Sequence, residues 1–224
     1  MRAPVELAQG LWRWTARHPD WHPGEFGREV ASYALCAGSE TLLIDPLLPA
    51  APRPVLELLD GLLTERLAIL VTIGYHARSA EVLWQRYRER LPTSIWGPAA
   101  VLKRVSHSAA FTRIEAGAPL PGGAIAYAIG RPRRGELPLH LPSHRALAFG
   151  DSVVGVDGEL RLWSTERVDE RRARWYAERF APTLAPLLEL DVERILVTHG
   201  EPILEQGADA LADALERPPW YHHG

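Results

Sequence analysis

The 224-residue sequence contains a single cysteine and a single lysine. Cys36 alone excludes an intrachain disulfide and a thiolate zinc cluster. Lys103 confines lysine-based covalent chemistry to one position. No apolar run reaches the roughly 18 residues of a membrane-spanning helix, and no N-terminal run is typical of a signal peptide. We therefore expect a cytoplasmic protein without a membrane partner.

The chain also lacks an excess of positive charge. Its formal net charge is -3, so the charge gives no reason to expect a nucleic-acid partner. Hydrophobic residues make up 46% of the chain, enough for a large core, and no Gly/Ser-rich or charge-rich linker divides it. We expect one domain over residues 1–224, with a small molecule as the partner and no indication of an oligomeric state.

The chain is organised around the stretch from Leu67 to Arg90. Residues 67–72 form an apolar run without alternation, which is typical of a strand buried on both faces. Residues 79–91 have apolar side chains at helical spacing. The polar segment 73–78 lies between them, at a strand end and before a helix, where α/β proteins commonly place their chemistry.

Other predicted strands also end in polar residues. Asp45 closes the strand 41–44, where it either binds backbone amides or faces a site. Asp151 follows the strand 145–149, and His199 follows the strand 192–197. We expect Thr72, Asp151 and His199 to meet at one edge of the fold.

The order of the segments LLIDP, ILVT, ALAFGD and ILVTHGEP resembles that of the metallo-β-lactamase fold, over nearly the whole chain. The resemblance implies an α/β protein (α+β type) built as a four-layer αββα sandwich. It also implies a site on one edge, between the two sheets.

The same resemblance implies a metal site that this chain retains only in part. Asp151 matches the bridging aspartate of the family, and His199 matches its last histidine. The four ligand positions of the central His-x-His-x-Asp-His motif fall on Ile73, Tyr75, Ala77 and Arg78. A further histidine position falls on Pro132, within a residue or two.

These replacements change the chemistry directly. Ile73 and Ala77 have no donor atom, and Arg78 is a permanent cation where a second metal would lie. We therefore predict no dinuclear zinc hydrolase and no cofactor, and we expect Arg78 to form an ion pair with Asp151.

His76 leaves an alternative open. With Asp151 and His199 it would provide two imidazoles and a carboxylate, the minimum for one zinc or iron ion. We favour the alternative in which His76 bonds neighbouring backbone or caps the helix. His199 is either a site residue or a histidine held between strand and turn, and Asp151 is well placed to accept backbone amides.

Two functions remain open on this basis. The first is a protein with a degenerate metal site whose pocket binds a small ligand, an anion among the candidates. The second is a hydrolase that uses one metal ion or none, with His76, Arg78, Asp151 and His199 as the candidate site residues.

Three segments outside these motifs carry further expectations. We expect the loop 18–24 to overhang the site with Trp21 as a wall. We expect His140 and His144 to lie on the surface, with His140 on a face that it shares with Glu136. The aromatic tail that begins at Pro218 is expected to dock on the protein without a chemical role.

Overall fold

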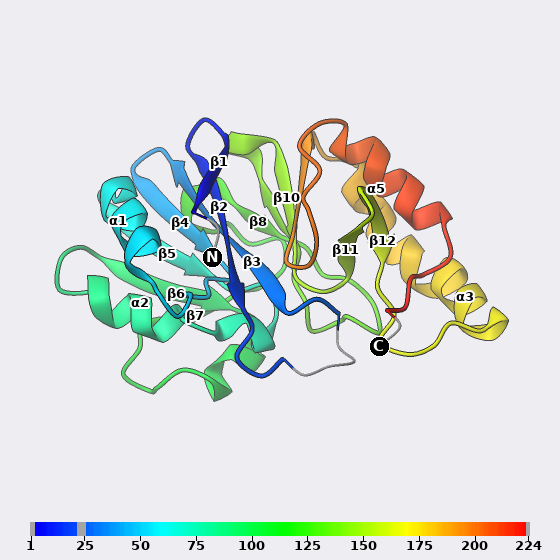
Figure 1. The fold of residues 1–224 in the computed structure, drawn as a ribbon, viewed down its shortest axis with the longest axis horizontal. Helices are drawn as coiled ribbons and strands as arrows, with labels where there is room; N and C mark the ends of the chain where they lie inside the picture. The colour runs from blue at the N-terminus through cyan, green and yellow to red at the C-terminus, as the bar shows by residue number, and fades with distance from the viewer. Residues whose placement is uncertain (1–2, 22–25, 223–224) are drawn as a thin grey trace.

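The structure is a computed structural model that describes residues 3–21 and 26–222 (Figure 1). Its first sheet has seven strands in sequence order, and four of them, β4 to β7, are parallel. The strands are β1 Val5–Ala8, β2 Leu11–Arg17, β3 Glu29–Ala37, β4 Glu40–Ile44, β5 Arg66–Leu70, β6 Thr93–Gly97 and β7 Phe111–Arg113.

A second sheet has four strands in the order β13-β10-β9-β8, with β10 and β13 parallel. A two-stranded antiparallel ribbon, β11 and β12, lies beyond it. These strands are β8 Ile125–Ala126, β9 Leu139–Leu141, β10 Ala146–Phe149, β11 Val153–Val156, β12 Glu159–Leu162 and β13 Arg194–Val197.

Helices cover the outer faces of the two sheets (Figure 1). The α-helices are α1 Arg53–Leu62, α2 Ala80–Tyr87, α3 Glu170–Trp175, α4 Ala181–Leu184 and α5 Gly207–Glu216. Short 3₁₀ segments are η1 Gly74–Ala77, η2 Ala99–Lys103, η3 Pro121–Gly123, η4 Pro142–His144 and η6 Ala185–Glu189, and the π-helical turn η5 is Tyr176–Phe180.

Alternation along the strands divides the core into three layers. Leu42 of β4 and Ala148 of β10 pack between the two sheets. Leu43 points the other way, toward α1 and α2, and Leu147 points toward α4 and α5. Because successive side chains of a strand face opposite sides, each apolar strand contributes to two layers at once. The predicted mixed α/β fold class is confirmed.

Some elements differ from the sequence-based expectation. The ribbon strand β11 was not predicted, because its four residues follow Asp151 without a clear period. The predicted helix 79–91 is shorter in the structure, where α2 ends at Tyr87. No helix of the described residues is long and apolar enough to cross a membrane.

Candidate functional site

Asp45 is the buried centre of a polar cluster at the carboxyl ends of β4 and β5. Its carboxylate accepts the Thr72 backbone N–H at 2.8 Å and the Thr72 hydroxyl at 2.5 Å. The backbone φ of Asp45 is +47°, a value that is uncommon for a residue other than glycine. Both sequence-based alternatives for Asp45 therefore hold, because it binds a backbone amide and also faces the site.

His76 is held by carboxylates on both sides of its ring. Its Nδ1 lies 2.8 Å from Asp45 Oδ2, and its Nε2 lies 3.2 Å from Asp151 Oδ1. The side chain is buried, and it neither caps α2 nor bonds the backbone, so that expectation was wrong. Burial and the charge of Arg78 act to lower the pKa of His76, but the two carboxylates outweigh them and raise it above 6.5.

Asp151 is shared by two imidazoles. His199 Nε2 lies 3.6 Å from the same Oδ1 atom that His76 approaches. Burial acts to raise the pKa of Asp151, but the two histidines hold it well below its usual range. Burial lowers the pKa of His199 below 6.5, and its Nδ1 is buried without a hydrogen-bond partner. The surroundings therefore favour the charged form of His76 and the neutral form of His199.

Arg78 lies in the site, but not in the predicted ion pair. Its Nη1 donates to the Asp45 backbone carbonyl at 3.2 Å. Among the ion pairs of the described residues, Asp151 is paired with His76 and His199 and not with Arg78. The strained Arg78 backbone, with φ of +35°, and the strand-end carbonyl of Asp45 set the direction of the guanidinium.

Glu136 has the role that we expected of Asp151. Its carboxylate accepts the backbone N–H groups of Gly150, Asp151 and Ser152 at 2.8 to 3.0 Å, and the Ser152 hydroxyl at 2.7 Å. Burial and the nearby Asp151 charge raise the pKa of Glu136 to about 7, against the effect of these donors. Glu136 thus fixes the loop that presents Asp151.

The assignment of His140 and Glu136 to an outward face was wrong. Glu136 is fully buried, and only 8% of His140 is exposed. The alternation was counted from Glu136, but β9 begins only at Leu139, so residues 136–138 do not follow its period.

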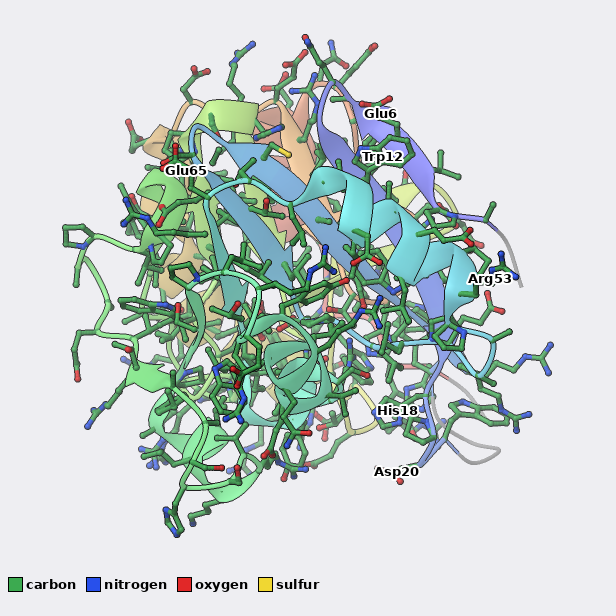
Figure 2. All side chains as sticks on the ribbon, turned by 90° about the vertical axis from the view of Figure 1, so that its left-hand side faces the viewer. Glu6, Trp12, His18, Asp20, Arg53 and Glu65 are labelled. Carbon is green, nitrogen blue, oxygen red and sulfur yellow. The ribbon has the colours of Figure 1, made fainter. Side chains whose placement is uncertain are left out.

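The polar cluster forms the floor of a pocket of about 440 Å³ with aromatic walls. His18 and Trp21 line it, as the overhanging-loop prediction requires, and the rest of that loop, residues 22–25, lies outside the described residues. Figure 2 places His18 and Asp20 at the end of the molecule away from Glu65. The remaining aromatic walls are Phe26, Tyr75, Trp163 and Tyr221.

The C-terminal tail contributes to this wall. Trp220 exchanges backbone hydrogen bonds with the end of β12, donating to Leu162 and accepting from Ser164 at 2.7 Å each. His222 accepts from the Trp163 indole at 3.4 Å and lines the pocket. Docking of the tail was predicted, but its contribution to the pocket was not.

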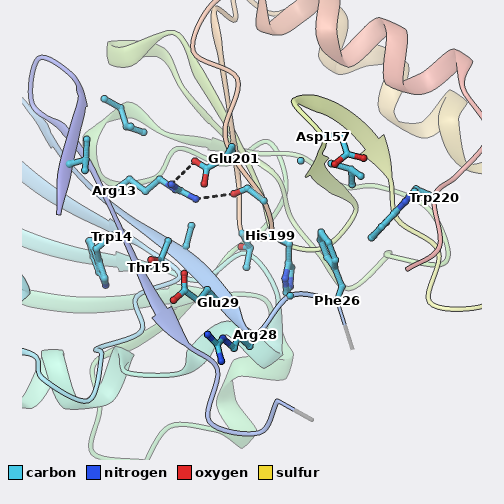
Figure 3. A pocket seen from close by; sticks show the side chains of 18 of the residues that line it. Arg13, Trp14, Thr15, Phe26, Arg28, Glu29, Asp157, His199, Glu201 and Trp220 are labelled. Atoms are coloured by element: carbon cyan, nitrogen blue, oxygen red, sulfur yellow. Dashed lines mark hydrogen bonds and ion pairs between the residues drawn. The ribbon is translucent and has the colours of Figure 1, made fainter. Parts of the chain in front are cut away.

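A second cavity of about 870 Å³ adjoins the pocket (Figure 3). Phe26 and His199 line both cavities, so His199 is accessible from two sides. Arg13 on β2 spans the second cavity, with hydrogen bonds to the Glu201 carboxylate at 2.7 Å and the Gly200 carbonyl at 2.9 Å.

The donor set does not fit the metal centre that the resemblance implies. Ile73 and Ala77 have no donor atoms, and both ring nitrogens of His76 are engaged by carboxylates. Arg78 adds a fixed positive charge beside them. Within residues 3–21 and 26–222, no three His, Cys, Asp or Glu side chains form a group that could hold a metal ion.

Solved structures with a similar fold were found by structural comparison. The metallo-β-lactamase DIM-1, exposed to ceftazidime, matches with a TM-score of 0.66 and 14% identity, over 95% of each chain. The metallo-β-lactamase FIM-1 from Pseudomonas aeruginosa, in its mono-zinc form, matches with a TM-score of 0.62 and 15% identity, over 95% of this chain and 94% of that one. A metallo-β-lactamase family protein from Thermus thermophilus matches with a TM-score of 0.58 and 18% identity, over 93% of this chain and 79% of that one.

No family profile and no curated protein matches this chain by sequence. The structural matches define the class, because all three are metallo-β-lactamase-type proteins aligned over most of this chain. The chain therefore has the metallo-β-lactamase fold, at low sequence identity to these structures.

The sequence offered Asp45 as a site residue only as one of two alternatives, and it did not indicate Glu136 as one. A signal was present for Asp45, an aspartate directly after a buried strand. No such signal existed for Glu136, because its partners are backbone groups 14 to 16 residues further along the chain.

Proposed function

We propose that this chain binds a small organic ligand in the pocket and does so without the metal centre of the resembling family. The observation that carries this proposal is the pairing of His76 with Asp45 and Asp151 by both ring nitrogens. A buried imidazole with a carboxylate at each ring nitrogen is held between them. It supports the floor of the pocket, and neither ring nitrogen faces a free site for a metal ion.

The pocket walls indicate the kind of ligand. Trp21, Phe26 and Trp163 offer aromatic faces for stacking, and Arg78 offers a guanidinium. The Nε atom of Arg78 is buried without a hydrogen-bond partner, so it is a donor for an oxygen of the ligand. A small aromatic anion matches these groups.

The experiment is isothermal titration of the protein with benzoate and with phenyl phosphate. We expect saturable 1:1 binding of at least one of them. In T165W, a large side chain replaces exposed Thr165 at the pocket and should weaken binding at least tenfold. The matched control T112W adds the same side chain at exposed Thr112 on β7 and should change binding less than twofold. Absence of binding for both probes, or equal effects of the two variants, would overturn the proposal.

A second function is favoured by the state of His199. This imidazole is neutral near pH 7, lies 3.6 Å from Asp151 and has a buried Nδ1 without a hydrogen-bond partner. A neutral imidazole beside a carboxylate can take a proton from water as a general base, which is the requirement for metal-free hydrolysis. His76 is less suited to this role because its surroundings raise its pKa and both ring nitrogens lie close to carboxylates.

Hydrolysis of p-nitrophenyl acetate at pH 7.5 tests this second function. If it is right, H199A lowers the rate at least a hundredfold, whereas H107A, at an exposed histidine, leaves it unchanged. A wild-type rate equal to that of H199A would exclude it.

A further inference from the structure

A third cavity of about 670 Å³ lies beside the pocket and has a positive lining. Lys103 ends η2 and Arg104 follows it, and Arg133 comes from the segment before β9. None of the described residues that line this hollow is acidic. We refer to it as the basic hollow.

Small residues keep the basic hollow open. Gly74 on η1 packs directly on Ala100 on η2, and a methyl group on Gly74 would lie only 2.7 Å from the Ala100 Cβ. Gly135 faces open space, with no atom within 4 Å of the position of a Cβ. The floor therefore has no long side chain that could neutralise or fill the cavity.

Arg133 presents donors that the protein itself does not use. Its Nε and Nη2 atoms are buried without a hydrogen-bond partner, and its guanidinium packs over the Trp163 ring at 5.0 Å. The nearby carboxylate of Glu136 already accepts four hydrogen bonds from residues 150–152. Buried charged donors without acceptors are costly, and an anionic oxygen in the hollow would satisfy them.

Tyr75 connects the basic hollow to the pocket. Its side chain lines both cavities, and the Arg104 guanidinium lies 4.5 Å from its ring centroid. Trp163, which carries Arg133 on its face, also lines the pocket. A ligand whose ring is in the pocket could thus reach past Tyr75 into the hollow.

We propose that the basic hollow binds the phosphate group of a phosphate monoester whose organic part lies in the pocket. This inference rests on the proposed ligand-binding function. Three cations and two unused guanidinium N–H groups match a dianionic, multi-oxygen group better than a single carboxylate. The specificity of the site is then for phosphorylated aromatic compounds.

Isothermal titrations at low ionic strength with phenyl phosphate, benzoate and inorganic phosphate test this inference. Phenyl phosphate should bind the wild type at least tenfold more tightly than benzoate does. R104E should weaken phenyl phosphate and inorganic phosphate at least tenfold and benzoate less than twofold. R66E makes the same charge change at an exposed arginine of β5 and should affect none of the three. Melting temperatures of both variants check that they fold.

The outcomes separate the two proposals. Phenyl phosphate binding that R104E leaves unchanged would overturn the basic hollow and leave the pocket intact. Inorganic phosphate binding that is sensitive to R104E, without binding of either aromatic probe, would support the hollow and overturn the pocket. No binding of any probe would overturn both.

Discussion

His76 lies between the carboxylates of Asp45 and Asp151 and is an ion-pair partner of both. Removing one partner of a buried charge network leaves the others without compensation. His76 therefore stabilises the fold and also forms part of the pocket floor.

We predict that H76A lowers the free energy of unfolding at pH 5.5 by about 3 to 5 kcal/mol. Because the pKa of folded His76 lies above 6.5, this contribution is fully present below pH 6.5 and declines as the pH rises through the folded pKa. Urea denaturation at pH 5.5 and at pH 9 measures it, with exposed His107 as the H107A control. A decrease in the free energy of unfolding of less than about 0.5 kcal/mol, as is usual for surface substitutions, would contradict this stabilising role of His76.

Glu136 is predicted to lower the stability of the folded protein, whereas His76 is predicted to raise it. Its pKa is about 7 in the folded protein against 4.5 ordinarily, so between these values the folded state holds more protons than the unfolded state. Stability therefore falls as the pH rises from 4.5 to 7, by about 3 kcal/mol for this group.

E136Q removes the titrating group, so it should also remove the contribution of Glu136 to the dependence of stability on pH. Urea denaturation of the wild type and E136Q at pH 4.5, 6 and 7.5 measures the difference between their slopes. The other titrating groups are common to both proteins, and their effect cancels. Parallel pH dependences in the two proteins would show that folding does not shift the pKa of Glu136.

At the scale of elements, the segment after β2 and the C-terminal tail together build the aromatic side of the pocket. Trp21 comes from the first and Tyr221 from the second, although 200 residues separate them in the chain. Trp21 is half-buried, and the Arg17 guanidinium lies 5.8 Å from its ring centroid. Its indole is thus available to a ligand without being part of the main core.

We predict that W21A weakens phenyl phosphate binding at least tenfold while it costs little stability, about 1 kcal/mol. The loss follows from the removal of one stacking face. W175A provides the control, since Trp175 on α3 is 37% exposed and lines no part of the pocket. Titration calorimetry and thermal denaturation separate the two effects. Unchanged affinity with a large loss of stability would place Trp21 in the core instead.

The sequence predicted elements well where their apolar pattern is complete within the segment. The residues of β4 and β5 are apolar enough to be recognised as buried strands, and each ends close to the predicted boundary. β11, and with it the ribbon, was not predicted because four residues are too few to show the alternation of a strand.

The site was predictable in position and less so in contacts. Thr72, Asp151 and His199 were expected at one edge because strand ends meet there, whereas His76 was expected to bond backbone or cap the helix. The partners of Arg78 and Glu136 depend on backbone groups of distant loops, which no local pattern encodes.

At the scale of the whole molecule, the chain has the layers of the metallo-β-lactamase fold, with Ile73, Tyr75, Ala77 and Arg78 in the segment after β5. The large cores on either side of the two sheets are independent of the site residues. Apolar packing can therefore hold the two sheet edges together, and the ion-paired cluster occupies the space between them.

The central claim, that this cluster replaces a metal centre, is tested most directly by elemental analysis of protein purified without an affinity tag. We expect well under one zinc or iron per chain after dialysis, and no rise in melting temperature on adding zinc, because Arg78 and the paired His76 oppose a cation. Stoichiometric zinc or iron that survives dialysis and is lost in H199A would contradict this claim and identify a single-metal hydrolase instead.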